Sequence, residues 1–420
     1  ALKANTTGTN NTAIGYNSMY EGVTTGSLNT MVGVSSGRKM TSGEQNSGLG
    51  INALEGNTTG SRNTGIGASS FAANISGSDN TAVGHAALGA NTTASDNTAV
   101  GRASLQANTT GTDNTAIGMQ SLNANTTGAN NVAVGFQALD SNTTANENVA
   151  VGRFSLFSNT EGTKNIAIGS YALDTNSTGD KNVAIGYQAL DANTTADNNV
   201  AVGDSALKAN TTGHSNVAVG YNVLALAVTG NENTGVGYNT LNSAVTGQGN
   251  NAFGYNNMSS LTTGASNTSI GSASSPALTT GANNTTAGAD SGISLTTGSN
   301  NVLLGHDAGR TGSPGGLINT GSNIIVLGDE NIANAHIQVD WTVASDQRDK
   351  TDFNNLNLGL DFVNKLNPVT YKWDKRSKYD KDLSVTPNGK HKQDWLDLGF
   401  KAQEVEALEI EAGYNKDNKT

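Results

Sequence analysis

A 17-residue repeat runs through most of this 420-residue chain and constrains its fold more than any other feature. A glycine marks each unit: Gly15 is followed by Gly33, and from there a glycine recurs every 17 residues as far as Gly305. Counted from this glycine, Asn stands at position −4, usually Ile or Val at −1 and usually Leu at +4. The unit reads N-[TV]-A-[VI]-G-x-x-[AS]-L-x-x-N-T-T-[GA]-x-x. A unit this short cannot form a pair of packed helices, so it indicates a solenoid of stacked β rungs.

Each unit divides into a strand and a turn. Positions −4 to −1 alternate with period two and predict a short strand. The N-T-T-G segment predicts a turn, because Asn tolerates left-handed backbone and Gly carries no Cβ. We also expect a second short strand over the A-L-x-x segment. About 18 such rungs, stacked about 4.8 Å apart, would form a rod roughly 85 Å long, whose handedness the sequence leaves open.

Identical rungs place identical residues in columns along the rod. We expect the side-chain amides at position −4 to bond one another from rung to rung. This ladder includes Asn97, Asn114, Asn131, Asn148, Asn165 and Asn182. A second asparagine column contains N-x-[ST] triplets, such as Asn108-Thr109-Thr110, which are also the signal for N-glycosylation. Because the triplet occurs in nearly every unit, turn chemistry explains it better.

The apolar content of the repeat is thin. Apolar residues make up 35% of the chain, and each rung is expected to bury one Leu and one or two Ile or Val. At about 1.5–3 kcal/mol per buried side chain, this barely offsets the cost of ordering 17 residues. We therefore expect the rungs to gain further burial from another chain.

Position −3 changes along the rod. It is Thr from residue 64 to residue 115, Val or Ile from residue 132 to residue 217, and Thr again at residue 234. We therefore expect the middle rungs to be the more buried ones. The comparison is between Val132, Val149, Ile166 and Val183 on one side and Thr81, Thr98 and Thr115 on the other.

Composition and charge exclude several classes of function. The net charge of −11 disfavours nucleic acid and anionic membranes as partners, and no apolar run is long enough for membrane insertion. No cysteine, phosphate-binding loop or histidine cluster is present, so we expect no cofactor and no metal site. No acidic pair recurs as in a glycan hydrolase, and acids such as Asp113, Asp140 and Glu147 are interpreted as scattered solvated charges.

Three regions follow from these patterns. Residues 1–305 form the solenoid shaft, and residues 306–344 form a transition with one last imperfect rung at 323–328 and a strand at 335–343. Residues 345–420 form a separate α+β domain, because they carry 13 of the 23 basic residues of the chain. In this domain the spacing predicts a helix over 358–366, a strand over 369–373 and a strand running into a helix over 398–408.

One short motif carries chemistry. The segment Ser345-Asp346-Gln347-Arg348-Asp349-Lys350 contains a serine and a lysine, the components of a nucleophile and base pair. Its ordinary interpretation is a helix that begins at a serine cap and continues as a solvated charge run. Two later segments, L-N-P-V-T-Y-K-W and L-G-F-K-A-Q-E-V-E, accompany the motif.

These residues resemble known families. The repeat is similar to the β-roll heads of trimeric autotransporter adhesins, and more so to the N-T-A-I-G arrays of phage tail-fibre proteins. The C-terminal motifs resemble the self-cleaving intramolecular chaperone domain of phage tail spikes and fibres, including endosialidases. The resemblance implies a homotrimer in which Ser345 is the nucleophile, Lys350 is the base and the Ala344–Ser345 bond is cut. Arg348 and Asp346 are candidate assisting residues, since a nearby positive charge favours neutral lysine.

The predicted function is that of a trimeric phage tail fibre in the virion. We expect it to bind a host-surface receptor, for which a glycan is one candidate, and to join other tail proteins through an N-terminal part. A bacterial trimeric surface adhesin is the alternative, and an ice-binding solenoid is a weaker one. Cleavage within one chain and cleavage between chains both remain open. Because family members continue beyond the segment that ends at Thr420, we expect a truncated chaperone domain and little cleavage in this chain.

Overall fold

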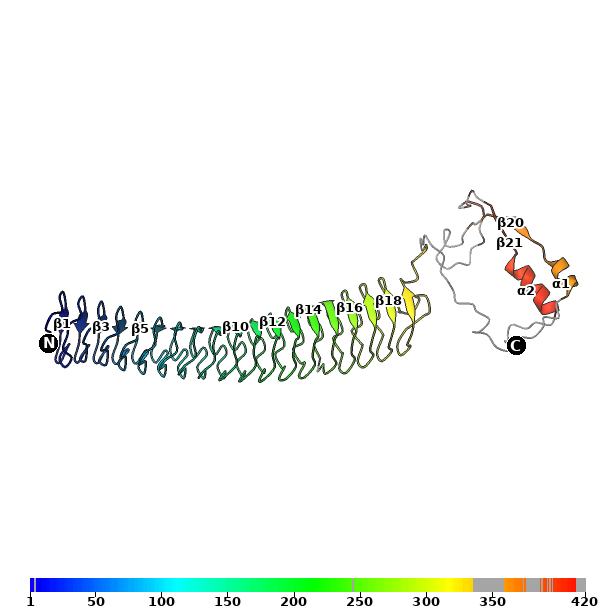
Figure 1. The fold of residues 1–420 in the computed structure, drawn as a ribbon. Coiled ribbons are helices and arrows are strands. Elements are labelled where there is room, and N and C mark those ends of the chain that lie inside the picture. Colours follow the sequence, from blue (N-terminus) through cyan, green and yellow to red (C-terminus); the bar gives the residue numbers. More distant parts are fainter. Residues whose placement is uncertain are drawn as a thin grey trace. The chain divides into compact units, whose positions relative to one another are not determined.

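The computed structural model describes residues 1–3, 5–243, 245–334, 359–372, 374, 386, 388–390, 392, 394 and 396–412. The chain divides into two compact units, Ala1–Asn331 and Ile332–Thr420. The first unit is a solenoid in which one strand of each rung joins a single parallel sheet of nineteen strands (Figure 1). The predicted class, a mostly β parallel solenoid with a small α+β region at the C-terminus, is confirmed.

The strands of the solenoid are short and follow the repeat. Their bounds are β1 (Thr12–Ile14), β2 (Thr30–Val32), β3 (Ser47–Leu49), β4 (Thr64–Ile66), β5 (Thr81–Val83), β6 (Thr98–Val100), β7 (Thr115–Ile117), β8 (Val132–Val134), β9 (Val149–Val151), β10 (Ile166–Ile168), β11 (Val183–Ile185), β12 (Val200–Val202), β13 (Val217–Val219), β14 (Thr234–Tyr238), β15 (Asn251–Tyr255), β16 (Thr268–Ile270), β17 (Thr285–Ala287), β18 (Val302–Leu304) and β19 (Ile325–Leu327). The second unit contains α1 (Leu360–Lys365), β20 (Val369–Tyr371), β21 (Asp397–Gly399) and α2 (Ala402–Glu411).

Each strand pairs in register with the same positions of the next rung. Ala133 faces Ala150, and Ala150 faces Ala167, so like residues stack on like. The mark glycine ends the strand with φ between about +110° and +142°, a region that other residues rarely adopt. A Cβ on Gly135 would also lie 2.5 Å from the carbonyl oxygen of Gly152 in the next rung. The glycine therefore permits both the bend and the close stacking.

The segment after the glycine is a turn, so the predicted second strand is wrong. Positions +2 and +4 have left-handed backbone, as at Gln137 (φ 52°) and Leu139 (φ 55°). These two left-handed residues point their N–H groups in opposite directions along the rod, and Ala138 between them donates to the Gly135 oxygen of its own rung at 3.5 Å. Gln137 donates to the carbonyl oxygen of Met119 in one neighbouring rung, and Leu139 donates to that of Ser155 in the other, each at 3.0 Å. The rungs thus bond to one another without extended backbone at this side.

Alanine and leucine form the apolar part of the core. The side chains at positions −2 and +4, such as Ala150 and Leu156, are fully buried. The space opposite the strand is narrow: a Cβ on Gly65 would lie 3.1 Å from Cγ of Leu54. Only Ala, Gly or a similarly compact residue fits most rungs at position −2, so the larger branched residues face outward.

Buried asparagines form the polar part of the core. The Oδ1 atom of Asn148 accepts a hydrogen bond from the backbone N–H of Asn165 at 2.9 Å, and its Nδ2 donates to the carbonyl oxygen of Gly162 at 2.9 Å. The same contacts recur up the column, and a second column links Asn142 to Asn125 at 2.8 Å. Because the amides of these columns bond to groups of the neighbouring rungs, the polar columns fix the rung spacing.

The branched residues at positions −3 and −1 lie on the outside of the sheet. Ile166 and Ile168 are 37% and 39% exposed, so the expectation that each rung buries one or two Ile or Val is wrong for the single chain. Within the single chain the predicted greater burial of the middle rungs is not seen either, since Val149 and Thr98 are both half-buried. On this face the branched side chains stack along the rod and stay partly exposed in the single chain.

We call this surface the apolar strand face. It consists of the outward residues of β8–β13, namely Val132, Val134, Val149, Val151, Ile166, Ile168, Val183, Ile185, Val200, Val202, Val217 and Val219.

Candidate functional site

The predicted self-cleavage segment lies outside the described residues. This applies to Ala344, Ser345, Asp346, Arg348 and Lys350, and also to the strand expected at 335–343. The described part of the second unit resumes at Gly359, and its geometry concerns the rest of the domain.

The described elements of this unit follow the sequence pattern. Helix α1 ends at Lys365, three residues before Pro368, and β20 follows directly. Strands β20 and β21 pair antiparallel, with Thr370 opposite Leu398, although 25 residues lie between the two strands in the chain. Helix α2 begins at Ala402, and Phe400 and Lys401 connect it to the end of β21. The two segments that carried the family resemblance are thus joined in one small sheet.

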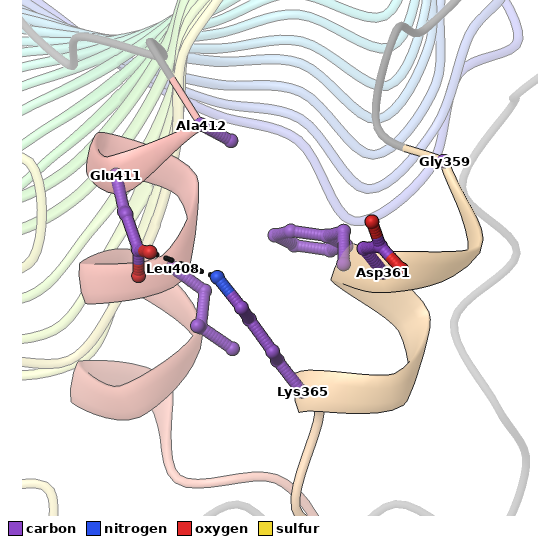
Figure 2. Close-up of a pocket in the computed structure, with 7 residues that line it drawn as sticks. Gly359, Asp361, Lys365, Leu408, Glu411 and Ala412 are labelled. Atoms are coloured by element: carbon purple, nitrogen blue, oxygen red, sulfur yellow. Dashed lines mark hydrogen bonds and ion pairs between the residues drawn. The ribbon is translucent and has the colours of Figure 1, made fainter.

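Helices α1 and α2 meet across an open pocket (Figure 2). Lys365 near the end of α1 donates to Oε1 of Glu411 at the end of α2 over 2.8 Å, and this hydrogen bond raises the pKa of Lys365. Phe362 and Leu408 line the same pocket. Both charged side chains are more than half exposed, so the pair orients the helices and is not a desolvated catalytic pair.

Large apolar side chains of this unit face outward. Neither helix buries a residue, and Leu360 and Leu398 are 74% and 81% exposed. Val363, Phe400 and Ile410 are exposed as well. A concentration of uncovered apolar residues in so small a unit is typical of a surface that is covered by another chain.

The comparison with known families gives the second unit an identity. Residues 345–414 match the family model described as chaperone of endosialidase. This segment is therefore similar to the chaperone-of-endosialidase family, and we call it the chaperone domain. The match covers about a sixth of the chain and begins at Ser345. No curated protein matches the chain.

The chaperone domain gives the chain a coarse assignment. An intramolecular chaperone that follows a β solenoid fits a phage tail-fibre protein and associates the chain with phage. Among the described residues, no helix is long and apolar enough to cross a membrane.

One group of side chains in the described part of the shaft combines donors suited to a metal ion. Asp290, His306 and Asp307 bring their ligand atoms within 4.8 Å of one another near the last rungs. Arg310 already donates to both carboxylate oxygens of Asp307 at 2.9 Å. Arg310 thus supplies the positive charge that a metal ion would otherwise provide, and we interpret the group as an ion-pair cluster.

The structure contains a column of half-buried carboxylates that the sequence did not lead us to predict. Asp140, Asp174 and Asp191 occupy position +5 of their rungs, and we call them the aspartate column. One oxygen of Asp140 and one of Asp174, Oδ1 in each, are buried without a hydrogen-bond partner. Asp140 is therefore not a scattered solvated charge. Aligning the units by the mark glycine shows the column, because position +5 is acidic three times within four successive rungs.

Burial raises the pKa of all three carboxyls of the aspartate column. For Asp174, burial and the neighbouring Asp191 charge raise the pKa to about 6. Between about pH 4 and pH 6 the folded chain therefore holds a proton that the unfolded chain releases. Stability falls as the pH rises through this window, and the penalty persists at neutral pH.

Asp174→Asn is expected to stabilise the shaft at pH 7 and to leave it nearly unchanged at pH 4. The asparagine removes a partly desolvated charge, and the repeat already has asparagine at the same position in Asn123. Because the carboxyl is about half exposed, solvent screening limits the gain to about 1 kcal/mol. Guanidinium unfolding at the two pH values measures it, with Asp113→Asn at an exposed position as the control. A gain of the same size at pH 4 would contradict this explanation.

Proposed function

We propose that this chain is the shaft and chaperone of a homotrimeric phage tail fibre that attaches to the host surface and releases its chaperone by self-cleavage. The observation that carries the proposal is the order of the two units. A solenoid of nearly identical rungs is followed by a chaperone-of-endosialidase domain whose family match begins at Ser345.

The repeat explains why such a shaft needs a chaperone. Strands pair at an offset of 17 residues, as between Val132 and Val149, and most rungs have the same residues at the same positions. Sliding one chain by a rung against its partners would therefore restore nearly every contact between chains, and the register is weakly specified. A C-terminal domain that associates first sets a common starting point, from which the rungs pair in order.

The surfaces available for association are the apolar strand face and the exposed apolar residues of the chaperone domain. Tyr221, Tyr238 and Tyr255, each directly after the mark glycine in the rungs of β13 to β15, form a separate column of rings that stack at 5.1 Å and 5.4 Å. A row of Val and Ile repeated in register from rung to rung suits parallel packing against a second copy of the same row. At about 25 cal/mol per Å² of apolar area, covering this row would supply the burial that the single rungs lack.

Self-cleavage requires an activated serine. In the proposed step a neutral Lys350 takes the proton of the Ser345 hydroxyl, and Oγ attacks the carbonyl carbon of Ala344. The C–N bond breaks, the Ser345 nitrogen takes a proton, and Ala344 is held as an ester. Water then hydrolyses the ester to leave a carboxylate on Ala344 and a free amine on Ser345. The attacking serine belongs to the same chain in this scheme, and attack from a neighbouring chain has the same balance.

The trimer is tested by the mass of the assembled protein in solution. One chain has a mass of 42.7 kDa, so light scattering on a Ser345→Ala protein is expected to give three times this value. The substitution keeps the chaperone attached, so that shaft and chaperone are weighed together. A stable rod with the mass of a single chain would refute the proposal.

A further inference from the structure

A cluster of aromatic rings interrupts the polar surface of the shaft in the rungs of β8 to β11. Phe136, Phe154, Phe157, Tyr171 and Tyr187 form this aromatic patch. Phe154 lies at its centre, with its ring centroid 5.4 Å from those of Phe136, Phe157 and Tyr171.

The guanidinium of Arg153 belongs to the aromatic patch as well. It lies 4.7 Å from the centroid of the Phe154 ring and 5.5 Å from that of Tyr171. Most rings of the patch are half-buried, and Tyr187 is 49% exposed. The patch is thus a fixed surface whose rings support one another and remain partly open to solvent.

The aspartate column runs through the same surface. Phe157 occupies position +5 between Asp140 and Asp174, and backbone hydrogen bonds join these levels, from Ser141 N–H to the Phe157 oxygen and from Ser158 N–H to the Asp174 oxygen. The rings are therefore flanked by carboxylates one rung away on either side. At the far end, the Gln188 side chain donates to Oδ2 of Asp191 at 3.3 Å.

The fold does not require these residues. Positions +2 and +5 hold Gln120 and Asn123 in the rung of β7, and Ser205 and Lys208 in the rung of β12, on the same backbone. The enclosed carboxylate oxygens lower the stability of the shaft and have no partner among the described residues. Residues that break a repeat at a cost in stability and gather on one surface are typical of a binding site.

From this arrangement we infer that the aromatic patch and the aspartate column bind an uncharged saccharide chain. The C–H face of a pyranose is apolar and packs on aromatic rings, while its hydroxyl groups donate to carboxylate oxygens. Recognition sites for small ligands combine apolar rings with a few polar groups in the same way. The inference names the ligand class for the host attachment proposed above, and it rests on that proposal only for its biological setting.

Charge decides against an anionic saccharide. Three carboxylates line the surface, and they would repel sialic or uronic acids at close range. Arg153 is engaged with the rings of Phe154 and Tyr171, and Lys208 lies beside Asp191 at the end of the column. The surface thus offers acceptors for hydroxyl protons, and its basic groups are already placed beside rings or acids.

The test is binding of the purified chain to an array of hexasaccharides. The array holds uncharged oligomers of glucose, galactose, mannose and N-acetylglucosamine, together with anionic oligomers of sialic and galacturonic acid. We expect the chain to bind at least one uncharged oligomer and none of the anionic ones. Phe154→Gln and Phe157→Gln should each weaken that binding about tenfold, the value of one aromatic contact of about 1.4 kcal/mol.

The variants are chosen so that folding is preserved. Glutamine occupies the position of Phe154 in Gln137 and Gln188 and the position of Phe157 in Gln106, so the repeat accommodates both changes. Tyr16→Ser, in the first rung, removes an exposed ring outside the patch and should leave binding unchanged.

Two outcomes would overturn the inference. One is a wild-type chain that binds no uncharged oligomer or only anionic ones, and the other is binding that survives the double variant Phe154→Gln, Phe157→Gln. Loss of the trimer mass in the double variant without any saccharide binding by the wild type would assign the patch to contacts between chains. The array measures only saccharide binding by the purified chain. A negative result would therefore not contradict the proposed trimer or its self-cleavage, which are tested separately.

Discussion

With its chaperone domain assembled, the chain is expected to split between Ala344 and Ser345 without an added protease, and the Ser345→Ala protein is expected to remain intact. Ser345→Ala removes the attacking oxygen, so no ester can form. Lys350→Ala removes the base, whose loss should slow cleavage by about 10²–10⁴-fold. Denaturing electrophoresis with mass spectrometry of both fragments measures the effect and locates the bond.

Two matched variants separate the dyad from general damage to the domain. Ser377→Ala and Lys378→Ala change the same residue types within the family-matched segment and should cleave like the wild type. Ser345→Cys keeps a nucleophile and should retain part of the cleavage. If the wild type stays whole, or if Ser345→Ala still splits at this bond, the dyad assignment is refuted and Ser345 is a helix cap.

A charged apolar strand face is expected to abolish the assembled shaft. In the double variant Ile166→Lys, Val183→Lys, three chains would bring six ammonium groups into one apolar interface. Each unpaired charge taken out of water costs several kcal/mol, which exceeds the gain from covering the remaining valines. In electrophoresis with SDS and without heating, we expect the wild type to migrate as a trimer and the variant as single chains. The reason is that an assembled trimeric solenoid unfolds too slowly for SDS to separate its chains.

The control for this experiment places lysine on another side of the rung. Thr178 is exposed in the N-S-T-G turn of the β10 rung, and Thr178→Lys should leave the trimer resistant. Far-ultraviolet circular dichroism should show the same β content in all three proteins, since outward side chains do not support the rung. A trimer that persists in the double lysine variant would place the interface elsewhere.

The repeat by itself predicts much of the fold. The 17-residue spacing places Asn148 above Asn131 and Ala150 above Ala133, so the stacking order follows from counting along the chain. The helices and strands of the chaperone domain were likewise predictable, because Pro368 limits α1 and the alternation after it is that of a strand. The family match at 345–414 agrees with the motifs read from the same residues.

The orientation of side chains was decided by the tertiary structure. Sequence reasoning placed the larger residues of the strand inside, yet in β9 it is Ala150 that is fully buried, while Val149 and Val151 stay half-buried. Likewise, the turn after the glycine satisfies its backbone through left-handed residues such as Leu139, a conformation that leucine rarely adopts alone. Local propensity favours a strand there, and burial of the leucine outweighs it.

The sequence by itself determined the period, the columns and the presence of the chaperone domain, because these depend on spacing and motif along one chain. Only the tertiary structure decided which columns are inside, which face is left apolar and where Phe154, Phe157 and the aspartate column come together. The physical reason is that a rung has two faces and a narrow interior. Which side chains fill it depends on residues from several rungs at once, and a repeat read along one chain does not contain that information.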